Sequence, residues 1–255
     1  MPVDIIPFEA LGRFENNWLD TRYHFSFADY HDPNRMGVGP LRVWNDDRIA
    51  PGMGFDPHPH RNMEIITYVR RGAITHRDNL GNEGRTEAGD VQVMSAGTGI
   101  VHAEYNLERE PTNLFQIWIM PNERGHAPRW DTRRFPKMDR AGTLVALASG
   151  GSNGGDALHI HADATLYGAT LPARQTLSVP LGSGRKAYLV PATGRLEAAG
   201  AILETRSGAA VRNVDSVAVS ALEDSELLFV DLPDGYFNRA RCAKLAASLS
   251  CKDFP

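Results

Sequence analysis

Two stretches, FDPHPHRNMEII (55–66) and GIVHAEYN (99–106), decide how this chain is interpreted. The close pairs that they contain are His58 with His60 and His102 with Glu104. One residue separates the members of each pair, and positions i and i+2 of a β-strand point to the same face. Two such strands side by side would present three imidazoles and a carboxylate in one direction. Because these donors suit a divalent first-row transition metal, the sequence predicts a mononuclear metalloprotein.

Conformationally restricted and permissive residues surround these pairs. Pro57 and Pro59 flank His58, and proline has a fixed φ angle and no amide donor, which predicts an irregular or edge strand. Gly97 and Gly99 precede His102 and allow a tight backbone path toward the metal.

The composition favours a β-protein and excludes some classes of function. The 255 residues are 42% hydrophobic and include 24 glycines and 16 prolines, which favours many short strands joined by turns. A formal charge of −4 argues against direct contact with nucleic acid, which usually requires a basic domain. We find no apolar run long enough to cross a membrane and no signal-peptide pattern, so we expect no membrane association.

Both cysteines, Cys242 and Cys251, lie near the C-terminus in a stretch (237–254) with a helical pattern. Nine residues of helix would place them roughly 13 Å apart along the axis, too far for a disulfide. We therefore expect a short C-terminal helix, reduced thiols and a cytoplasmic location.

A weak internal repeat indicates two similar β-domains. In the first half, turn residues bound strand-like segments: 24–30, 64–72, 73–78, 90–97 and 115–121. In the second half, the segments that match three of them are 186–194, 207–213 and 227–233. Superposing the halves places Pro180 opposite His58, Gly182 opposite His60 and Ala221 opposite His102. The sequence therefore predicts one metal site, in the first domain.

The spacing Gly52-x₅-His58-x-His60-x₃-Glu64 matches the first signature of the cupin superfamily. Gly89-x₅-Ser95-x-Gly97, leading to His102, resembles the second signature. The later position of His102 and the segments PLRVWNDDRIAPG (40–52) and MSAGTGIVHAEYN (94–106) resemble the pirin family, most closely its bacterial quercetin 2,3-dioxygenase-like members.

This resemblance implies an all-β bicupin, in which two antiparallel β-barrel (jelly-roll) domains face each other. We expect a metal-binding cupin domain over residues 1–140 and a cupin-like domain without metal ligands over residues 141–255.

By position, the resemblance implies that His58, His60, His102 and Glu104 bind the metal. Glu64 occupies the place of the usual cupin carboxylate ligand, and we expect it to share the strand parity of the first two histidines and face the same cavity. Iron is the expected ion, and the donors leave nickel, cobalt, manganese, copper and zinc open.

The resemblance implies a metal-dependent dioxygenase that cleaves a flavonol such as quercetin with O₂; another small aromatic or enolic substrate remains open. The reaction needs a general base for the substrate hydroxyl, and we expect Glu104 to fill this role, with Glu64 in reserve. The alternative is a metal-binding regulatory or redox-sensing protein that acts through a protein partner.

Other aromatic and histidine residues receive structural interpretations. We expect His159 and His161 on the wet face of an amphipathic strand. We expect His76 at the surface near a turn, and a place at the mouth of the cavity is the alternative. Trp44 and Trp118 are expected in the core rather than in a pocket wall.

Overall fold

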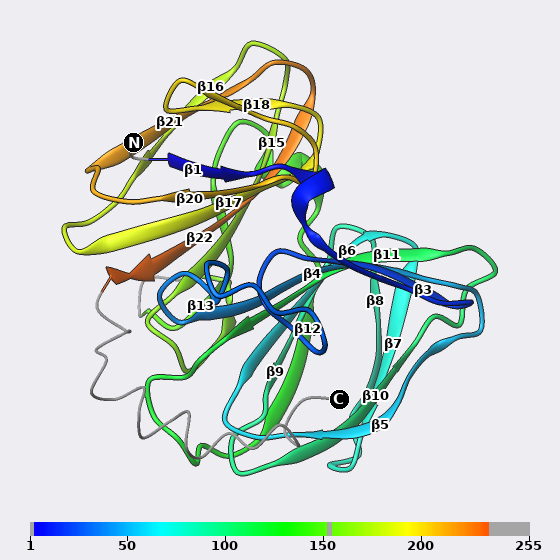
Figure 1. Ribbon diagram of the computed structural model, residues 1–255. Coiled ribbons are helices and arrows are strands. Elements are labelled where there is room, and N and C mark those ends of the chain that lie inside the picture. Colours follow the sequence, from blue (N-terminus) through cyan, green and yellow to red (C-terminus); the bar gives the residue numbers. More distant parts are fainter. Residues whose placement is uncertain (1–2, 152–154, 235–255) are drawn as a thin grey trace. The chain divides into compact units, whose positions relative to one another are not determined.

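The computed structural model describes residues 3–151 and 155–234 (Figure 1). The described chain divides into two compact units. The first unit comprises Gly12–Arg134 and Ile160–Ala162, and contains both histidine stretches. The second unit is built from Phe135–His159 and Asp163–Asp234, together with the N-terminal segment up to Leu11.

The first unit consists of two antiparallel sheets. A seven-stranded sheet has the order β12 (Arg129–Arg133), β9 (Val91–Ser95), β6 (Glu64–Arg71), β11 (Thr112–Ile119), β4 (Leu41–Ile49), β3 (Leu19–Tyr23), β2 (Gly12–Glu15). A four-stranded sheet has the order β5 (Gly54–His60), β10 (Ile100–Tyr105), β7 (Ala73–Asp78), β8 (Glu83–Glu87).

The second unit has the same plan. Its seven-stranded sheet has the order β1 (Val3–Ile6), β20 (Gly208–Val211), β17 (Arg185–Thr193), β22 (Ser225–Pro233), β15 (Thr165–Leu171), β13 (Val145–Ser149), β14 (Leu158–His159). Its four-stranded sheet has the order β16 (Thr176–Pro180), β21 (Ser216–Ala221), β18 (Leu196–Ala198), β19 (Ala201–Leu203). The described chain also contains the short 3₁₀ helices η1 (Phe8–Ala10) and η2 (Lys137–Arg140).

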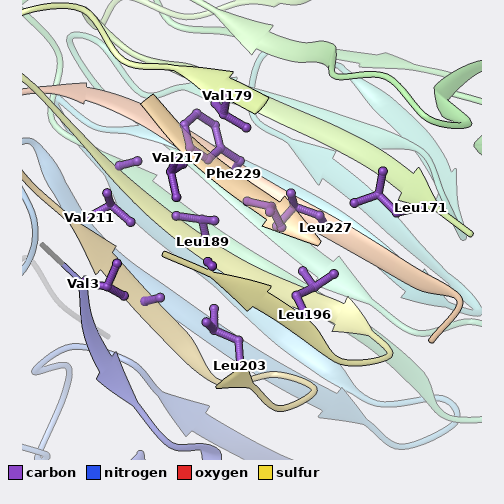
Figure 2. Packing of buried hydrophobic residues seen from close by; sticks show 14 of the residues in the cluster. Val3, Leu171, Val179, Leu189, Leu196, Leu203, Val211, Val217, Leu227 and Phe229 are labelled. Atoms are coloured by element: carbon purple, nitrogen blue, oxygen red, sulfur yellow. The ribbon is translucent and has the colours of Figure 1, made fainter. Parts of the chain in front are cut away.

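The core of the second unit lies between its two sheets (Figure 2). Leu189, Val211 and Phe229 of the larger sheet pack with Val179 and Leu196 of the smaller sheet in one buried cluster. Alternation along each strand supplies these apolar faces, because successive side chains of a strand point to opposite faces.

The predicted repeat is confirmed in the order of the strands. β6, β9 and β11, which contain the first copies of the repeated segments, hold the same places in their sheet as β17, β20 and β22. The all-β prediction is also confirmed. The expected barrels are not closed, however, since no described strand joins the two sheets of a unit.

The prediction of a strand over residues 24–30 is wrong. Phe27 and Tyr30 instead form an isolated bridge across a tight turn, in which Ala28 has a φ angle of 49°. An extended strand cannot accommodate this left-handed residue. The expected C-terminal helix with Cys242 and Cys251 lies outside the described residues. In the described part of the chain, helices with the length and hydropathy of a membrane span are absent.

Candidate metal centre

Three neighbouring strands of the four-stranded sheet carry the polar side chains of the candidate site. β10 lies between β5 and β7. Its His102 pairs with His58 on β5 and with Asp78 on β7. Two residues further along β10, Glu104 pairs with His76 on β7. The edge position of β5 agrees with its two prolines, which cannot donate ladder hydrogen bonds.

The three histidines of the sequence motifs come together. Ring centroids lie 4.8 Å apart for His58 and His60, 4.5 Å for His58 and His102, and 5.0 Å for His60 and His102. One donor atom from each residue lies within 4.8 Å of the others. Burial lowers the pKa of all three imidazoles, that of His60 to about 3. These rings are therefore neutral near pH 7 and retain the lone pairs that a metal requires.

Two of these rings show which nitrogen is free for an ion. His58 Nδ1 lies 2.7 Å from the Asp56 carbonyl oxygen, which can only accept, so Nδ1 carries the proton and Nε2 the lone pair. His102 Nε2 is buried and has no hydrogen-bond partner among the described residues. A buried polar atom without a partner is costly, and a metal ion in this position would remove that cost. The residues present therefore fit a divalent cation.

Glu104 is buried in a network that fixes its carboxylate. Gln92 donates to Oε1 at 2.6 Å and Gln116 donates to Oε2 at 2.8 Å. Trp118 Nε1 donates to the amide oxygen of Gln116 at 3.1 Å, which turns the Gln116 NH₂ group toward Glu104. Thr67 Oγ1 also donates to Oε1, at 3.4 Å. Because each carboxylate oxygen has two lone pairs, Oε2 is the oxygen that keeps capacity for a further partner.

The Glu104 carboxylate belongs to a second donor group, formed with His76 and His102. The two groups overlap at His102. Burial, with a smaller contribution from the charge of Asp47, raises the pKa of Glu104 to about 7. A nearby cation would oppose this shift, because it favours the ionised carboxylate.

Glu64 does not share the face of the histidine pair. It begins β6 in the other sheet of the unit, so the strand parity expected from the sequence does not apply. Its buried carboxylate accepts a hydrogen bond from Ser95 Oγ at 2.6 Å and one from the His161 backbone. Neither donor group includes Glu64.

Sequence reasoning missed several residues around the site. His76, expected at the surface, is fully buried and bonds to Asp78 and His102. Its i, i+2 spacing to Asp78 on one strand was the available signal. Asp47 and Gln92 belong to the other sheet and gave no local signal.

Of His159 and His161, only one has the solvent-exposed position that the sequence predicted. His159 is exposed, whereas His161 is half-buried and stacks on His126 with ring centroids 3.9 Å apart. β14 ends at His159, so the two residues do not share a strand.

A cavity of about 550 Å³ borders the candidate site. His58, Gln116 and the buried Asp47 line it. Most of the remaining wall is aromatic or apolar: Phe14, Leu19, Tyr23, Phe27, Tyr30, Phe55 and Trp118. Trp118 belongs to a buried apolar cluster, as expected, and also forms part of the cavity wall, with its ring centroid 4.9 Å from that of His60. Trp44 is fully buried, as expected.

Family models match both halves of the chain. The model described as Pirin matches residues 7–119, and the model described as Quercetinase C-terminal cupin domain matches residues 146–232. A pirin-like protein of Caulobacter vibrioides is 58% identical over 90% of this chain and 99% of its own length. A protein of Escherichia coli K12 named quercetin 2,3-dioxygenase is 40% identical over 87% of this chain and 95% of its own length.

A solved structure with the same fold is the bacterial pirin YhhW from Escherichia coli in complex with nickel(II). It superposes with a TM-score of 0.86 at 38% identity, and the match covers 91% of this chain and 99% of that chain. These similarities extend over both units and include the two histidine stretches. The chain belongs to the pirin family of cupin proteins.

Proposed function

We propose that this protein is a metal-dependent dioxygenase that opens a flavonol such as quercetin with O₂. A single divalent cation would be held by His58, His60, His102 and Glu104. The observation that carries the proposal is the convergence of three neutral imidazoles beside a buried carboxylate. The Escherichia coli relative named quercetin 2,3-dioxygenase and the nickel complex of YhhW support it.

The cavity beside His58 supports a small aromatic substrate. Its volume of about 550 Å³ falls within the range of pockets that enclose small organic ligands. Tyr23, Phe27 and Trp118 offer ring surfaces for a flat aromatic compound, and Asp47 and Gln116 offer polar partners for its hydroxyl groups. Such a combination of apolar walls and few polar groups fixes the orientation of a ligand.

A bound cation would act as a Lewis acid for the deprotonated oxygen of the substrate and leave room for an exogenous ligand. Glu104 is the proposed general base for the 3-hydroxyl proton, which one of its carboxylate oxygens would accept. Gln92 and Gln116 hold that carboxylate in place. Its pKa is about 7 in metal-free protein, and a bound cation would lower it, so the carboxylate would be ionised and able to accept a proton at neutral pH. Because Glu64 is bonded elsewhere, the proposal gives it no role.

The test is the incubation of metal-loaded protein with quercetin in the presence of O₂. We expect loss of the flavonol absorbance with release of carbon monoxide. His102→Ala should abolish both signals, and Glu104→Gln should reduce turnover by about 10²–10⁴-fold, the usual contribution of a general base. Inactivity with iron, nickel, cobalt, manganese and copper alike would refute flavonol cleavage.

A further inference from the structure

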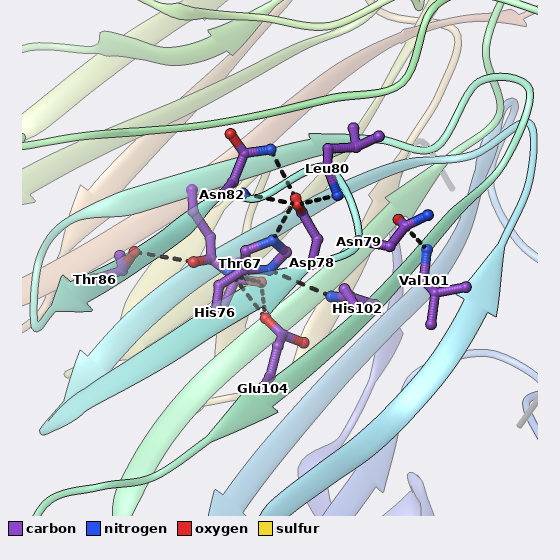
Figure 3. Close-up of polar contacts among 11 residues, drawn as sticks. Thr67, His76, Asp78, Asn79, Leu80, Asn82, Thr86, Val101, His102 and Glu104 are labelled. Carbon is purple, nitrogen blue, oxygen red and sulfur yellow. Dashed lines mark hydrogen bonds and ion pairs between the residues drawn. The ribbon is translucent and has the colours of Figure 1, made fainter.

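Three buried side chains form a hydrogen-bonded row across β7 and β10 (Figure 3). Asp78 Oδ2 lies 3.0 Å from His76 Nε2, and His76 Nδ1 lies 3.4 Å from His102 Nδ1. The side chains of His76 and Asp78 are at most 1% exposed, and His102 is 2% exposed. Their polar atoms therefore depend on protein partners for hydrogen bonds.

Asp78 sets the direction of donation along this row. Its carboxylate accepts hydrogen bonds from the backbone amides of Leu80 and Asn82 and from the Asn82 side chain, at 2.8–3.0 Å (Figure 3). Although burial works against ionisation, these donors and His76 outweigh it and lower the pKa of Asp78. An ionised carboxylate only accepts hydrogen bonds, so His76 Nε2 must donate to it.

The tautomer of His102 follows from this direction. The Nδ1 atoms of His76 and His102 face each other at 3.4 Å, and a neutral imidazole that donates from Nε2 presents a lone pair at Nδ1. His102 Nδ1 must then donate to that lone pair. His102 is left with its own lone pair on Nε2, the buried atom without a hydrogen-bond partner among the described residues.

We propose that Asp78 and His76 are positioning residues, which hold the His102 ring in the Nδ1–H tautomer and so prepare Nε2 to bind the metal. This inference rests on the proposed metal site and not on the identity of the substrate. Ligating histidines commonly donate their second ring nitrogen to an outer partner, and loss of that partner typically costs 10–100-fold in metal affinity. Here a neutral imidazole backed by a carboxylate is that partner.

Packing holds His76 in the orientation that the row requires. The Trp130 ring stacks on His76 with centroids 4.8 Å apart and an interplanar angle of 7°. Gly84 on the neighbouring strand makes room for this tryptophan, since a Cβ there would lie 2.2 Å from the Trp130 ring. Both ring nitrogens of His76 already have partners within the row, which favours a positioning role over a ligand role for this residue.

Nickel(II) titration of matched variants tests the proposal. His76→Phe retains a ring that stacks on Trp130 but removes both nitrogens, whereas His76→Asn retains a side-chain oxygen that can accept from His102. Asp78→Asn retains the size and the turn acceptor but removes the charge. His24→Phe is the control, because His24 is equally buried and also contacts a tryptophan, yet belongs to neither donor group.

We expect His76→Phe to weaken nickel binding by 10–100-fold, Asp78→Asn to weaken it less, and His76→Asn to recover part of the loss. The ¹⁵N spectrum of His102 in metal-free protein should show the Nδ1–H tautomer in the parent and the Nε2–H tautomer in His76→Phe. The control should bind nickel as the parent does.

Parent-like nickel affinity and an unchanged His102 tautomer in His76→Phe would overturn the proposal. A bound-histidine count by X-ray absorption that falls by one in His76→Phe would also overturn it, by making His76 a ligand. If His76→Phe fails to fold, the nickel affinity and the His102 tautomer of Asp78→Asn test the proposal instead. Neither readout involves a flavonol, so failure of the proposed dioxygenase activity remains separable.

Discussion

The protonation state of each imidazole decides whether the histidine cluster can hold a cation. His60 is 5% exposed, and burial followed by the charge of His58 lowers its pKa to about 3. The ring therefore stays neutral throughout the physiological range, and protons compete weakly with a metal. Buried imidazole nitrogens without a partner are also unfavourable in metal-free protein. Metal binding would therefore stabilise the folded state of this unit.

Replacement of one imidazole tests this view. We expect His60→Gln to lose more nickel affinity than the 10–100-fold that removal of an outer partner costs, because a donor atom itself disappears. The matched control is His159→Gln, an exposed histidine of the other His-x-His pair. Metal analysis after dialysis gives the readout, and equal nickel content in both variants would contradict the ligand assignment.

The two buried carboxylates predict how the stability of metal-free protein depends on pH. Burial is the largest cause that raises the pKa of Asp47 and of Glu104, each to about 7. A carboxyl group whose pKa is raised on folding binds protons more tightly in the folded state, so unfolding becomes easier as pH rises from about 4 through 7.

We therefore expect Asp47→Asn to raise the free energy of unfolding of metal-free protein more at pH 8 than at pH 4.5. The difference between the two effects should be on the order of 2–4 kcal/mol, because a tenfold change in proton affinity corresponds to ~1.4 kcal/mol. Denaturant unfolding of parent and variant at both pH values measures the difference. Added nickel should reduce it, since a cation favours the ionised carboxylates. An equal effect of the substitution at both pH values would contradict the prediction.

At the scale of elements, the contact between β5 and β10 sets the geometry of the three histidines. Gly54 lies opposite Tyr105, and a Cβ at Gly54 would lie 2.1 Å from the Glu104 carbonyl oxygen and 2.6 Å from the Tyr105 Cα. Both are backbone atoms, which cannot rotate away as a side chain can. A side chain larger than glycine would therefore separate the two strands that carry the imidazoles.

Gly54→Ala should destabilise the protein by about 1–3 kcal/mol, as overpacking usually does, and should weaken nickel binding as well. Gly151→Ala provides the control, because its added methyl group would meet only Ser149 Oγ at 3.6 Å, an ordinary contact. Thermal unfolding and nickel titration of both variants give the comparison. Parent-like nickel affinity in Gly54→Ala would show that strand spacing does not position the donors.

The sequence predicted those elements whose signal is local. Period-two alternation located β6, β7 and β9, and the paired prolines predicted that β5 is an edge strand. The histidines of the i, i+2 pairs come together because register pairs their strands directly. A contact partner was not predicted where it comes from the opposite sheet, as with Gln92 beside Glu104.

Local pattern failed where tertiary contacts override it. Residues 24–30 alternate like a strand, yet the turn at Ala28 reverses the chain so that Tyr23 stacks on Tyr30 with ring centroids 6.2 Å apart. Glu64 has the spacing of a ligand, but the chain changes sheets between His60 and Glu64. The spacing between two residues does not show that the chain passes from one sheet to the other, because strands of both sheets have the same two-residue alternation.

At the scale of the whole molecule, one fold plan occurs twice but the donor groups occur once. Within the described residues, both groups of potential metal ligands lie in the first unit. The strand that corresponds to β5 is β16, and its last residue is Pro180 where β5 has histidines. In the second unit the apolar cluster of Figure 2 lies between the sheets.

The N-terminal strand belongs to that second unit, which yields a prediction about chain organisation. β1 pairs with β20 from Val3–Val211 to Ile6–Gly208, and Val3 packs into the buried apolar cluster of this unit. Val3→Asp would place a carboxylate in this cluster and should cost roughly 2–4 kcal/mol, because a buried polar group without a partner is destabilising.

Asp4→Val is the matched control, since Asp4 neighbours Val3 on the same strand but has an exposed side chain. Denaturant unfolding should show the loss for Val3→Asp only. Nickel stoichiometry under native conditions should equal that of the parent in both variants, because every donor lies in the first unit. Loss of nickel from folded Val3→Asp would mean that the metal centre depends on the integrity of the second unit, and the prediction would then be wrong.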